Sequence, residues 1–127
     1  MDQMISSCES VSRGANDALL IGDMPYMSYQ ISNEEAVRNA GRFICAGMDC
    51  VKVEGAQIER IKAIADSGIM VMSHLGLTPH TRAKLGGYRV QGKTAKQAEI
   101  ILEQALKLQE AGCSFLLLEG MPRESAG

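Results

Sequence analysis

Val51-Lys52-Val53-Glu54-Gly55 is the stretch that decides the fold of this chain. Apolar and charged residues alternate in it, as is typical of a β-strand, so Lys52 and Glu54 share one face and the valines share the other. We expect helices to cover the valines and the two charged side chains to lie near the carboxyl end of the strand. A buried Lys–Glu ion pair that only fills space is the alternative interpretation.

Three further apolar runs end in an ionisable residue. Leu19-Leu20-Ile21-Gly22 leads into Asp23, Met70-Val71-Met72-Ser73 into His74, and Phe115-Leu116-Leu117-Leu118 into Glu119. A charged or polar group is costly to bury at the end of an apolar strand unless it has partners or a function. The carboxyl ends of parallel strands are also where α/β proteins build their active sites. The pattern therefore indicates an enzyme.

Glycines separate these runs from helical patterns. Gly14, Gly47, Gly68 and Gly112 each follow such a pattern, as helix C-caps do. Capping boxes, Ser32 with Glu35 and Thr94 with Gln97, open two of the predicted helices. The predicted helices are 1–13, 33–46, 57–67 and 95–111, and the last of them carries one apolar face formed by Ile100, Ile101, Ala105, Leu108 and Ala111.

Alternating strands and helices predict an α/β fold of parallel βα units, with strands that are buried on both faces. The repeated strand–acid–glycine pattern is typical of a (β/α) barrel, but only about four strands can be counted, whereas a closed barrel needs eight. The sequence therefore predicts one domain over residues 1–127, either a small open sheet or part of a larger barrel.

The composition excludes several classes of partner. A net charge of −2 and 4% aromatic residues leave no basic or stacking surface for nucleic acid. No apolar stretch approaches the roughly 20 residues of a membrane span, and no signal peptide is visible. The four cysteines show no metal-binding spacing. We expect reduced thiols and a cytoplasmic protein that binds neither nucleic acid nor membranes.

Each candidate residue suggests a type of chemistry. Asp23, followed by Met24-Pro25, lies at the start of a defined loop and suits a hard cation such as Mg²⁺. Glu119, which follows four apolar residues, suits a general base, with a surface glutamate as the alternative. His74 is either a pocket residue or a hydrogen-bonded core histidine. The glycine-rich stretch 76–93 is a substrate-binding loop, a lid or a plain connection.

Taken together, these segments resemble the ketopantoate hydroxymethyltransferase family. Each matching motif is short, but all five occur in the family's order across nearly the whole chain. They are Gly22-Asp23-Met24-Pro25-Tyr26-Met27-Ser28-Tyr29, Val51-Lys52-Val53-Glu54-Gly55, Ser73-His74-Leu75-Gly76-Leu77-Thr78-Pro79, Gly86-Gly87-Tyr88-Arg89-Val90-Gln91-Gly92-Lys93 and Leu118-Glu119-Gly120-Met121-Pro122.

The resemblance implies a (β/α)₈ barrel of the phosphoenolpyruvate-mutase and isocitrate-lyase type. It implies transfer of a hydroxymethyl group from 5,10-methylenetetrahydrofolate to 3-methyl-2-oxobutanoate with Mg²⁺, a step toward pantothenate. By motif match, Asp23 and Glu54 would ligate the metal, and Asp23, Lys52 and His74 would bind the substrate. Glu119 would be the proton acceptor.

The resemblance also implies that this chain corresponds to the middle of the family's barrel, about strands three to six of the eight. The family carries a further metal-binding aspartate, in a Gly-Asp-Ser motif, on a strand that precedes this region. We therefore expect a truncated chain with little activity alone. It would work as a homo-oligomer or with a complementary fragment. The alternative is a non-catalytic assembly module that pairs through open sheet edges.

Overall fold

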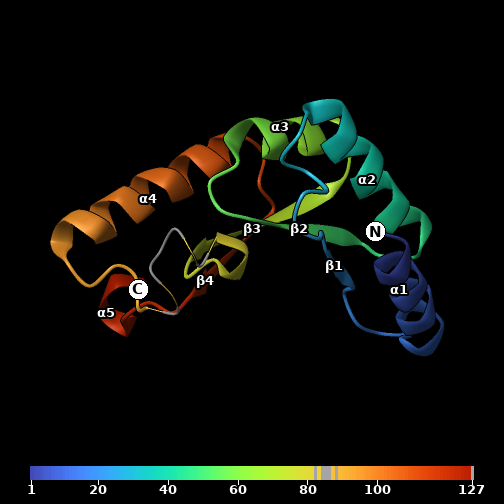
Figure 1. The fold of residues 1–127 in the computed structure, drawn as a ribbon, viewed down its shortest axis with the longest axis horizontal. Coiled ribbons are helices and arrows are strands. Elements are labelled where there is room, and N and C mark those ends of the chain that lie inside the picture. The colour runs from blue at the N-terminus through green and yellow to red at the C-terminus, as the bar shows by residue number, and fades with distance from the viewer. Residues whose placement is uncertain (82, 84–86, 88, 127) are drawn as a thin grey trace.

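The computed structural model describes residues 1–81, 83, 87 and 89–126, and a four-stranded parallel sheet forms its centre (Figure 1). The strands lie in chain order, and each is parallel to its neighbours. The predicted α/β class and the four parallel strands are thus confirmed. The strands are β1 Ile21–Asp23, β2 Cys50–Glu54, β3 Met70–Gly76 and β4 Phe115–Glu119.

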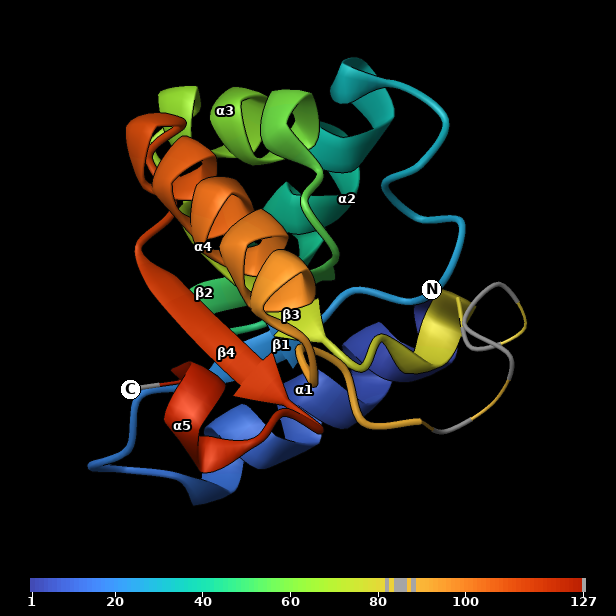
Figure 2. The ribbon, with the colours of Figure 1, turned by 90° about the vertical axis from the view of Figure 1, so that its left-hand side faces the viewer.

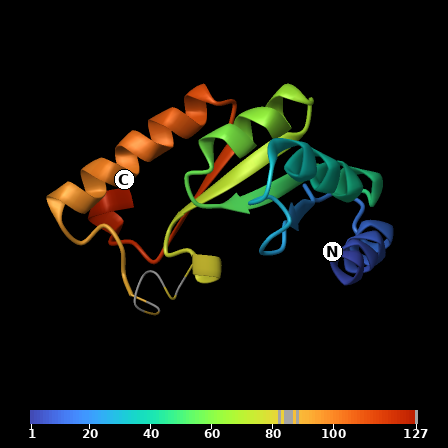
Figure 3. The ribbon, with the colours of Figure 1, turned by 45° about the horizontal axis from the view of Figure 1, so that its top comes forward.

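Three long helices cover one face of the sheet (Figure 2). They are α2 Asn33–Cys45, α3 Ile58–Asp66 and α4 Ala95–Glu110, each within two residues of its predicted bounds. In the same view α1, Asp2–Gly14, and the short α5, Arg123–Ala126, lie below the sheet, and α1 also contacts α2. Figure 3 shows these two terminal helices at opposite ends of the molecule. None of the helices in the described part of the chain has the length and hydrophobicity that a membrane crossing requires.

The core lies between β2, β3 and the helices. Val51 and Val53 of β2 are fully buried, and so are Phe43 of α2 and Ile61 and Ile64 of α3, which belong to the same cluster. The predicted alternation of β2 is therefore correct, with the valines facing the helices. Burial of this apolar surface is the main favourable contribution to folding.

Strand β4 differs from the prediction that the strands are buried on both faces. Phe115, Leu116 and Leu117 are 38%, 40% and 36% exposed. Among the described residues β4 pairs only with β3. Its far edge therefore lacks a strand partner in this part of the chain. The predicted apolar face of α4 is also only partly buried, since Leu108 is buried but Ile100 is 46% exposed.

The helix ends follow the predicted caps in part. Ser32 accepts a hydrogen bond from the backbone N–H of Glu35, and Thr94 accepts one from Gln97. The side chain of Gln97 accepts from the N–H of Lys93 and so does not close a box with Thr94. Gly14 is the last residue of α1, and Ala15 follows it as the C-cap.

The loop between β3 and α4 contains an unpredicted short helix, η1, Pro79–Thr81 (Figure 3). It brings His80 back toward the end of β2, where its backbone N–H contacts Glu54. Residues 82, 84–86 and 88 of the predicted glycine-rich loop lie outside the described residues. The four cysteines are free thiols, and burial raises the pKa of Cys50 to about 11.

Gly22 is required by close packing between β1 and α2. A Cβ atom at this position would lie 2.3 Å from Cδ1 of the fully buried Phe43. We predict that Gly22→Ala lowers the free energy of unfolding by about 1–3 kcal/mol, because the core must shift to accept the added methyl group. Urea denaturation followed by circular dichroism measures the change.

Gly41→Ala is the matched control for this substitution. Gly41 lies inside α2, and a Cβ there would meet no atom within 4 Å. The control should raise the free energy of unfolding by about 0.5–1 kcal/mol, as alanine does in a helix interior. Equal stability of Gly22→Ala and the parent chain would contradict the packing described above.

Candidate active site

The five residues that the sequence singled out lie together at the carboxyl end of the sheet. Asp23, Glu54 and Glu119 are the last residues of β1, β2 and β4. The parallel register pairs Asp23 with Lys52, Glu54 with His74, and Gly76 with Glu119. The intervening residues Gly22, Val53 and Leu75 pack toward the helices, so by alternation the five candidates share the opposite face.

Lys52 forms an ion pair with Asp23. Its Nζ atom lies 2.7 Å from Oδ2 of Asp23, and its side chain is 19% exposed. The alternative interpretation, a Lys52–Glu54 ion pair, is therefore wrong, because Lys52 pairs with Asp23 on the neighbouring strand β1. The other carboxylate oxygen of Asp23, Oδ1, is buried without a hydrogen-bond partner among the described residues. That oxygen can accept a ligand without losing an existing bond.

Glu54 is the most buried of the three acids, with 5% of its side chain exposed. Its Oε2 atom accepts a hydrogen bond of 2.9 Å from the backbone N–H of His80, whose Nδ1 lies 3.6 Å away. The backbone N–H of Glu54 donates to the hydroxyl of Tyr29 at 3.2 Å. These contacts compensate part of the cost of burying the carboxylate.

Tyr29 contacts three elements at this end of the sheet, namely the end of β2, η1 and α3. Its hydroxyl lies 3.2 Å from Nδ1 of His80 and receives the N–H of Glu54, while Arg60 donates to its carbonyl at 3.1 Å. Burial raises the pKa of Tyr29 to about 12, so the phenol stays protonated in the physiological range. Because the folded chain favours the protonated phenol, this pKa shift adds to the free energy of unfolding. The added stability is complete below pH 10 and is lost as the pH rises through about 12.

Neither Tyr29 nor His80 was assigned a role from the sequence. Tyr29 lies inside the motif that follows β1, and His80 is one of only two histidines in the chain. No periodic pattern surrounds either residue, so the sequence did not predict that the two side chains would be in contact. Tyr29 could have been predicted as a site residue, because it places a large aromatic ring in a short loop that follows a strand-end acid.

His74 lies between two carboxylates and is 1% exposed. Its Nε2 atom is 3.2 Å from Oε2 of Glu119, and its Nδ1 atom is 4.0 Å from Oε1 of Glu54. Neither ring nitrogen makes a hydrogen bond of good geometry with a described residue. The side chain of Glu119 is 47% exposed, so this acid reaches both solvent and the site.

Gly76 allows β3 and β4 to approach each other beside Glu119. Its φ angle is +90°, and a Cβ atom there would lie 2.3 Å from the carbonyl oxygen of Glu119. The same carbonyl accepts a hydrogen bond of 2.8 Å from the N–H of Leu77. Only glycine fits this backbone geometry without strain. Gly76 therefore allows the end of β3 to lie close to the backbone of Glu119 and so determines the position of that residue.

Two carboxylates are available to hold a divalent cation. Asp23 and Glu54 lie on neighbouring strands, and Oδ1 of Asp23 is free. No group of three or more His, Cys, Asp or Glu side chains with metal-site geometry occurs among the described residues. Mg²⁺ is usually bound by one or two carboxylates together with water and substrate oxygens. The donor set therefore fits Mg²⁺ and fits Zn²⁺ poorly.

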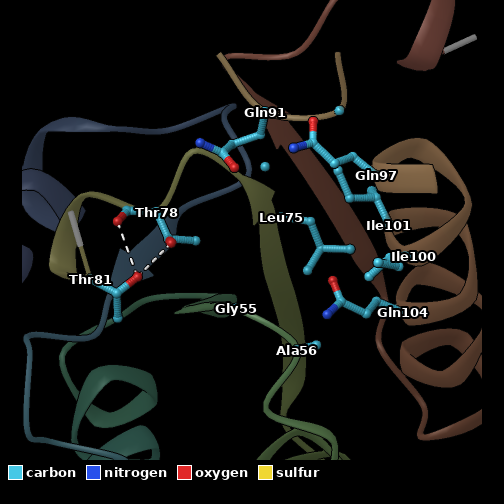
Figure 4. A pocket seen from close by; sticks show the side chains of 12 residues that line it. Gly55, Ala56, Leu75, Thr78, Thr81, Gln91, Gln97, Ile100, Ile101 and Gln104 are labelled. Atoms are coloured by element: carbon cyan, nitrogen blue, oxygen red, sulfur yellow. Dashed lines mark hydrogen bonds between the residues drawn. The ribbon is translucent and has the colours of Figure 1, made fainter. Parts of the chain in front are cut away.

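A cavity of about 340 Å³ lies on the other side of β3. Leu75, Gln97, Ile101 and Gln104 line it, and Figure 4 shows these side chains between β3 and α4. None of the five candidate residues lines this cavity. It lies beneath the partly buried α4, and its lining also includes Gly55 and Gly76, which lie beside the candidate residues Glu54 and Glu119.

Comparison with solved structures identifies the fold. The chain is similar to 2,3-dimethylmalate lyase, a PEP mutase/isocitrate lyase superfamily member, with a TM-score of 0.70 and 16% identity over 98% of this chain and 44% of that chain. It is also similar to a putative phosphonomutase from Burkholderia cenocepacia, with a TM-score of 0.71 and 15% identity over 95% of this chain and 54% of that chain. These similarities confirm the predicted barrel type at the level of the fold.

Comparison with known sequences identifies the family. The chain is 49% identical to 3-methyl-2-oxobutanoate hydroxymethyltransferase of Alkaliphilus metalliredigens over 98% of its own length and 45% of the relative. It is 50% identical to the enzyme of that name from Pseudothermotoga lettingae over 99% of its length and 49% of the relative. The chain thus spans about half the length of these relatives. The family profile matches residues 1–127, and the chain belongs to the ketopantoate hydroxymethyltransferase family.

Proposed function

We propose that a barrel containing this chain transfers a hydroxymethyl group from 5,10-methylenetetrahydrofolate to 3-methyl-2-oxobutanoate, giving 2-dehydropantoate for pantothenate biosynthesis. The observation that carries the proposal is the convergence of Asp23, Lys52, Glu54 and Glu119 on one face at the strand ends. Family membership supports it, since the relatives carry the name of this activity. The four strands would be about strands three to six of the eight.

Asp23 and Glu54 would hold Mg²⁺ in this barrel, with Oδ1 of Asp23, which is buried and has no hydrogen-bond partner among the described residues, as one ligand atom. Bound there, the ion would supply Lewis-acid stabilisation of negative charge on the keto oxygen of the substrate. Lys52, held beside Asp23 by the 2.7 Å ion pair, places a fixed positive charge next to the same position. Its role would be to bind the carboxylate or keto oxygen of the substrate.

Glu119 would be the base that removes the proton from the carbon next to the carbonyl. Its side chain is half exposed and lies on the same face as Lys52, so it can reach a substrate bound above β2 and β3. The electron pair left on that carbon would then form a bond to the one-carbon unit, whose bonds to the folate nitrogens break; water supplies the hydroxyl oxygen of the product, and tetrahydrofolate leaves. Lys52 stabilises the charge that develops on the keto oxygen. His74 would lie next to Glu119, at the base of the site.

A chimeric enzyme tests this function. The 127 residues would replace the matching segment of the Alkaliphilus metalliredigens relative, to which they are 49% identical. We expect the chimera to form 2-dehydropantoate. Lys52→Met should lower kcat/KM by about 10- to 100-fold, because a charge-assisted hydrogen bond contributes about 1.5–3 kcal/mol.

Lys62→Met serves as the control for this substitution. Lys62 lies on α3, its side chain is 64% exposed, and it pairs with Asp66. The control should retain the activity of the chimera. An inactive chimera, or equal activity of the Lys52 and Lys62 variants, would contradict the proposed function.

A second candidate function is a non-catalytic assembly module. It is favoured by the exposed apolar residues of β4 and by Ile21 of β1, which is 36% exposed. Exposed edge strands pair with other chains. The partner would be a second copy of the chain or a complementary fragment, and the homo-oligomeric, cytoplasmic form is the arrangement that we propose for either function.

Sedimentation velocity of the 127-residue chain at several concentrations tests assembly through β4. We predict association that increases with concentration, and that Leu117→Lys weakens it, because a charge on an edge strand disfavours pairing. Val11→Lys changes an exposed apolar residue of the helix α1, 54% exposed and outside the sheet, and should leave association unchanged. A stable folded monomer at every concentration would exclude this candidate.

A further inference from the structure

His74 is held rigidly at the centre of the site. It lies on β3, an interior strand that pairs with β2 on one side and β4 on the other. Its register partners are Glu54 and Leu117, and its side chain is 1% exposed. Both the backbone and the ring are therefore fixed by their surroundings. A buried imidazole in such a position is expected to have hydrogen-bond partners.

The two nearest partners of His74 are both carboxylates. Nε2 lies 3.2 Å from Glu119 and Nδ1 lies 4.0 Å from Glu54. The ring nitrogens make no hydrogen bond of good geometry with any described residue. At 3.2 Å the Nε2 atom is within reach of Glu119, and a small rotation of that side chain would align the bond. At 4.0 Å the Nδ1 atom is too far from Glu54 for a direct bond.

The two acids differ in their freedom to move. Glu54 is 5% exposed, and its Oε2 atom already accepts the backbone N–H of His80. The side chain of Glu119 is 47% exposed, and its one ionic contact among the described residues is to His74. A half-exposed glutamate samples several rotamers unless a partner selects one. The rigid imidazole can therefore select one rotamer of Glu119, whereas the rotamer of Glu54 is already fixed by its other contacts.

We propose that His74 is a positioning residue that donates its Nε2–H to Glu119 and holds that carboxylate over the sheet face. This assignment differs from a substrate-binding role, because a ring that is 1% exposed and faces two carboxylates presents almost no surface to a substrate. The catalytic meaning of the contact rests on the proposed function, in which Glu119 is the base. The contact itself does not, and it can be tested on the chain alone.

Nuclear magnetic resonance of the ¹⁵N-histidine-labelled chain tests the contact directly. The chain has two histidines, so the spectrum contains two rings, and a His80→Gln variant assigns them. We expect Nε2 of His74 to carry a proton whose signal moves in Glu119→Gln. It should not move in Glu110→Gln, which changes an exposed glutamate at the end of α4. The proposal would be overturned if the chemical shift of His74 is the same with and without Glu119→Gln. A chemical shift equal to that of histidine in an unfolded chain would overturn it as well.

Replacement of the imidazole by an amide separates positioning from packing. The amide nitrogen of glutamine can reach the place of Nε2, whereas the amide nitrogen of asparagine reaches only the place of Nδ1. With ¹³C-glutamate labelling, the carboxylate signal of Glu119 should keep its position in His74→Gln and move toward the value of a free glutamate in His74→Asn. Equal signals in the two variants, with equal melting temperatures, would contradict an orienting contact.

Kinetics of the chimera then connect the contact to catalysis. His74→Asn should lower kcat by at least tenfold with little change in KM for 3-methyl-2-oxobutanoate, and His74→Gln should recover most of that loss. A rise in KM alone would assign His74 to substrate binding and overturn the proposal. An inactive parent chimera would reject the proposed function, whereas the resonance experiments would still decide whether His74 contacts Glu119.

Discussion

The parallel pairing of β2 with β1 and β3 is the constraint on which the candidate site depends. It places Lys52 opposite Asp23 and His74 opposite Glu54. Strand alternation then sends these side chains to one face, because Val51 and Val53 are fixed in the core against the helices. A shift of β2 by one residue would bury Lys52 and Glu54 among apolar side chains, at a cost that the fold could not recover. The hydrophobic core therefore determines the geometry of the polar site.

The acids at the strand ends differ in their surroundings, and this difference suggests different tasks. Glu54 is almost fully buried and is held by His80 and by the network around Tyr29. Asp23 and Glu119 are about half exposed, with side chains at 48% and 47%. A fixed, buried carboxylate suits the organisation of a site, whereas a half-exposed one can meet a substrate. Among the described residues Lys52 pairs with Asp23 alone, so this end of the sheet carries three carboxylates for one lysine.

Local sequence pattern predicted the strands, the long helices and the convergence of the site, because alternation and glycine caps act over a few residues. Val51-Lys52-Val53-Glu54 shows this directly, since its alternation became the two faces of β2. The contact between Tyr29 and His80 joins residues 51 positions apart, and no local pattern reports such a contact. The helix η1 and the exposure of β4 also escaped prediction. The first follows from the packing of one loop over Glu54, and the second from the absence of a strand partner for β4 in the described part of the chain.

We propose that these strand ends form a site for removing a proton from an α-keto acid. The most direct measurement is exchange of the C3 hydrogen of 3-methyl-2-oxobutanoate into D₂O by the chimera, with Mg²⁺ and without any folate. Exchange isolates proton removal from the later transfer of the one-carbon unit. We predict exchange by the chimera and a loss of about 10²- to 10⁴-fold in Glu119→Gln, the usual contribution of a general base. A chimera that forms 2-dehydropantoate and exchanges the C3 hydrogen equally fast with glutamine at position 119 would contradict this proposal.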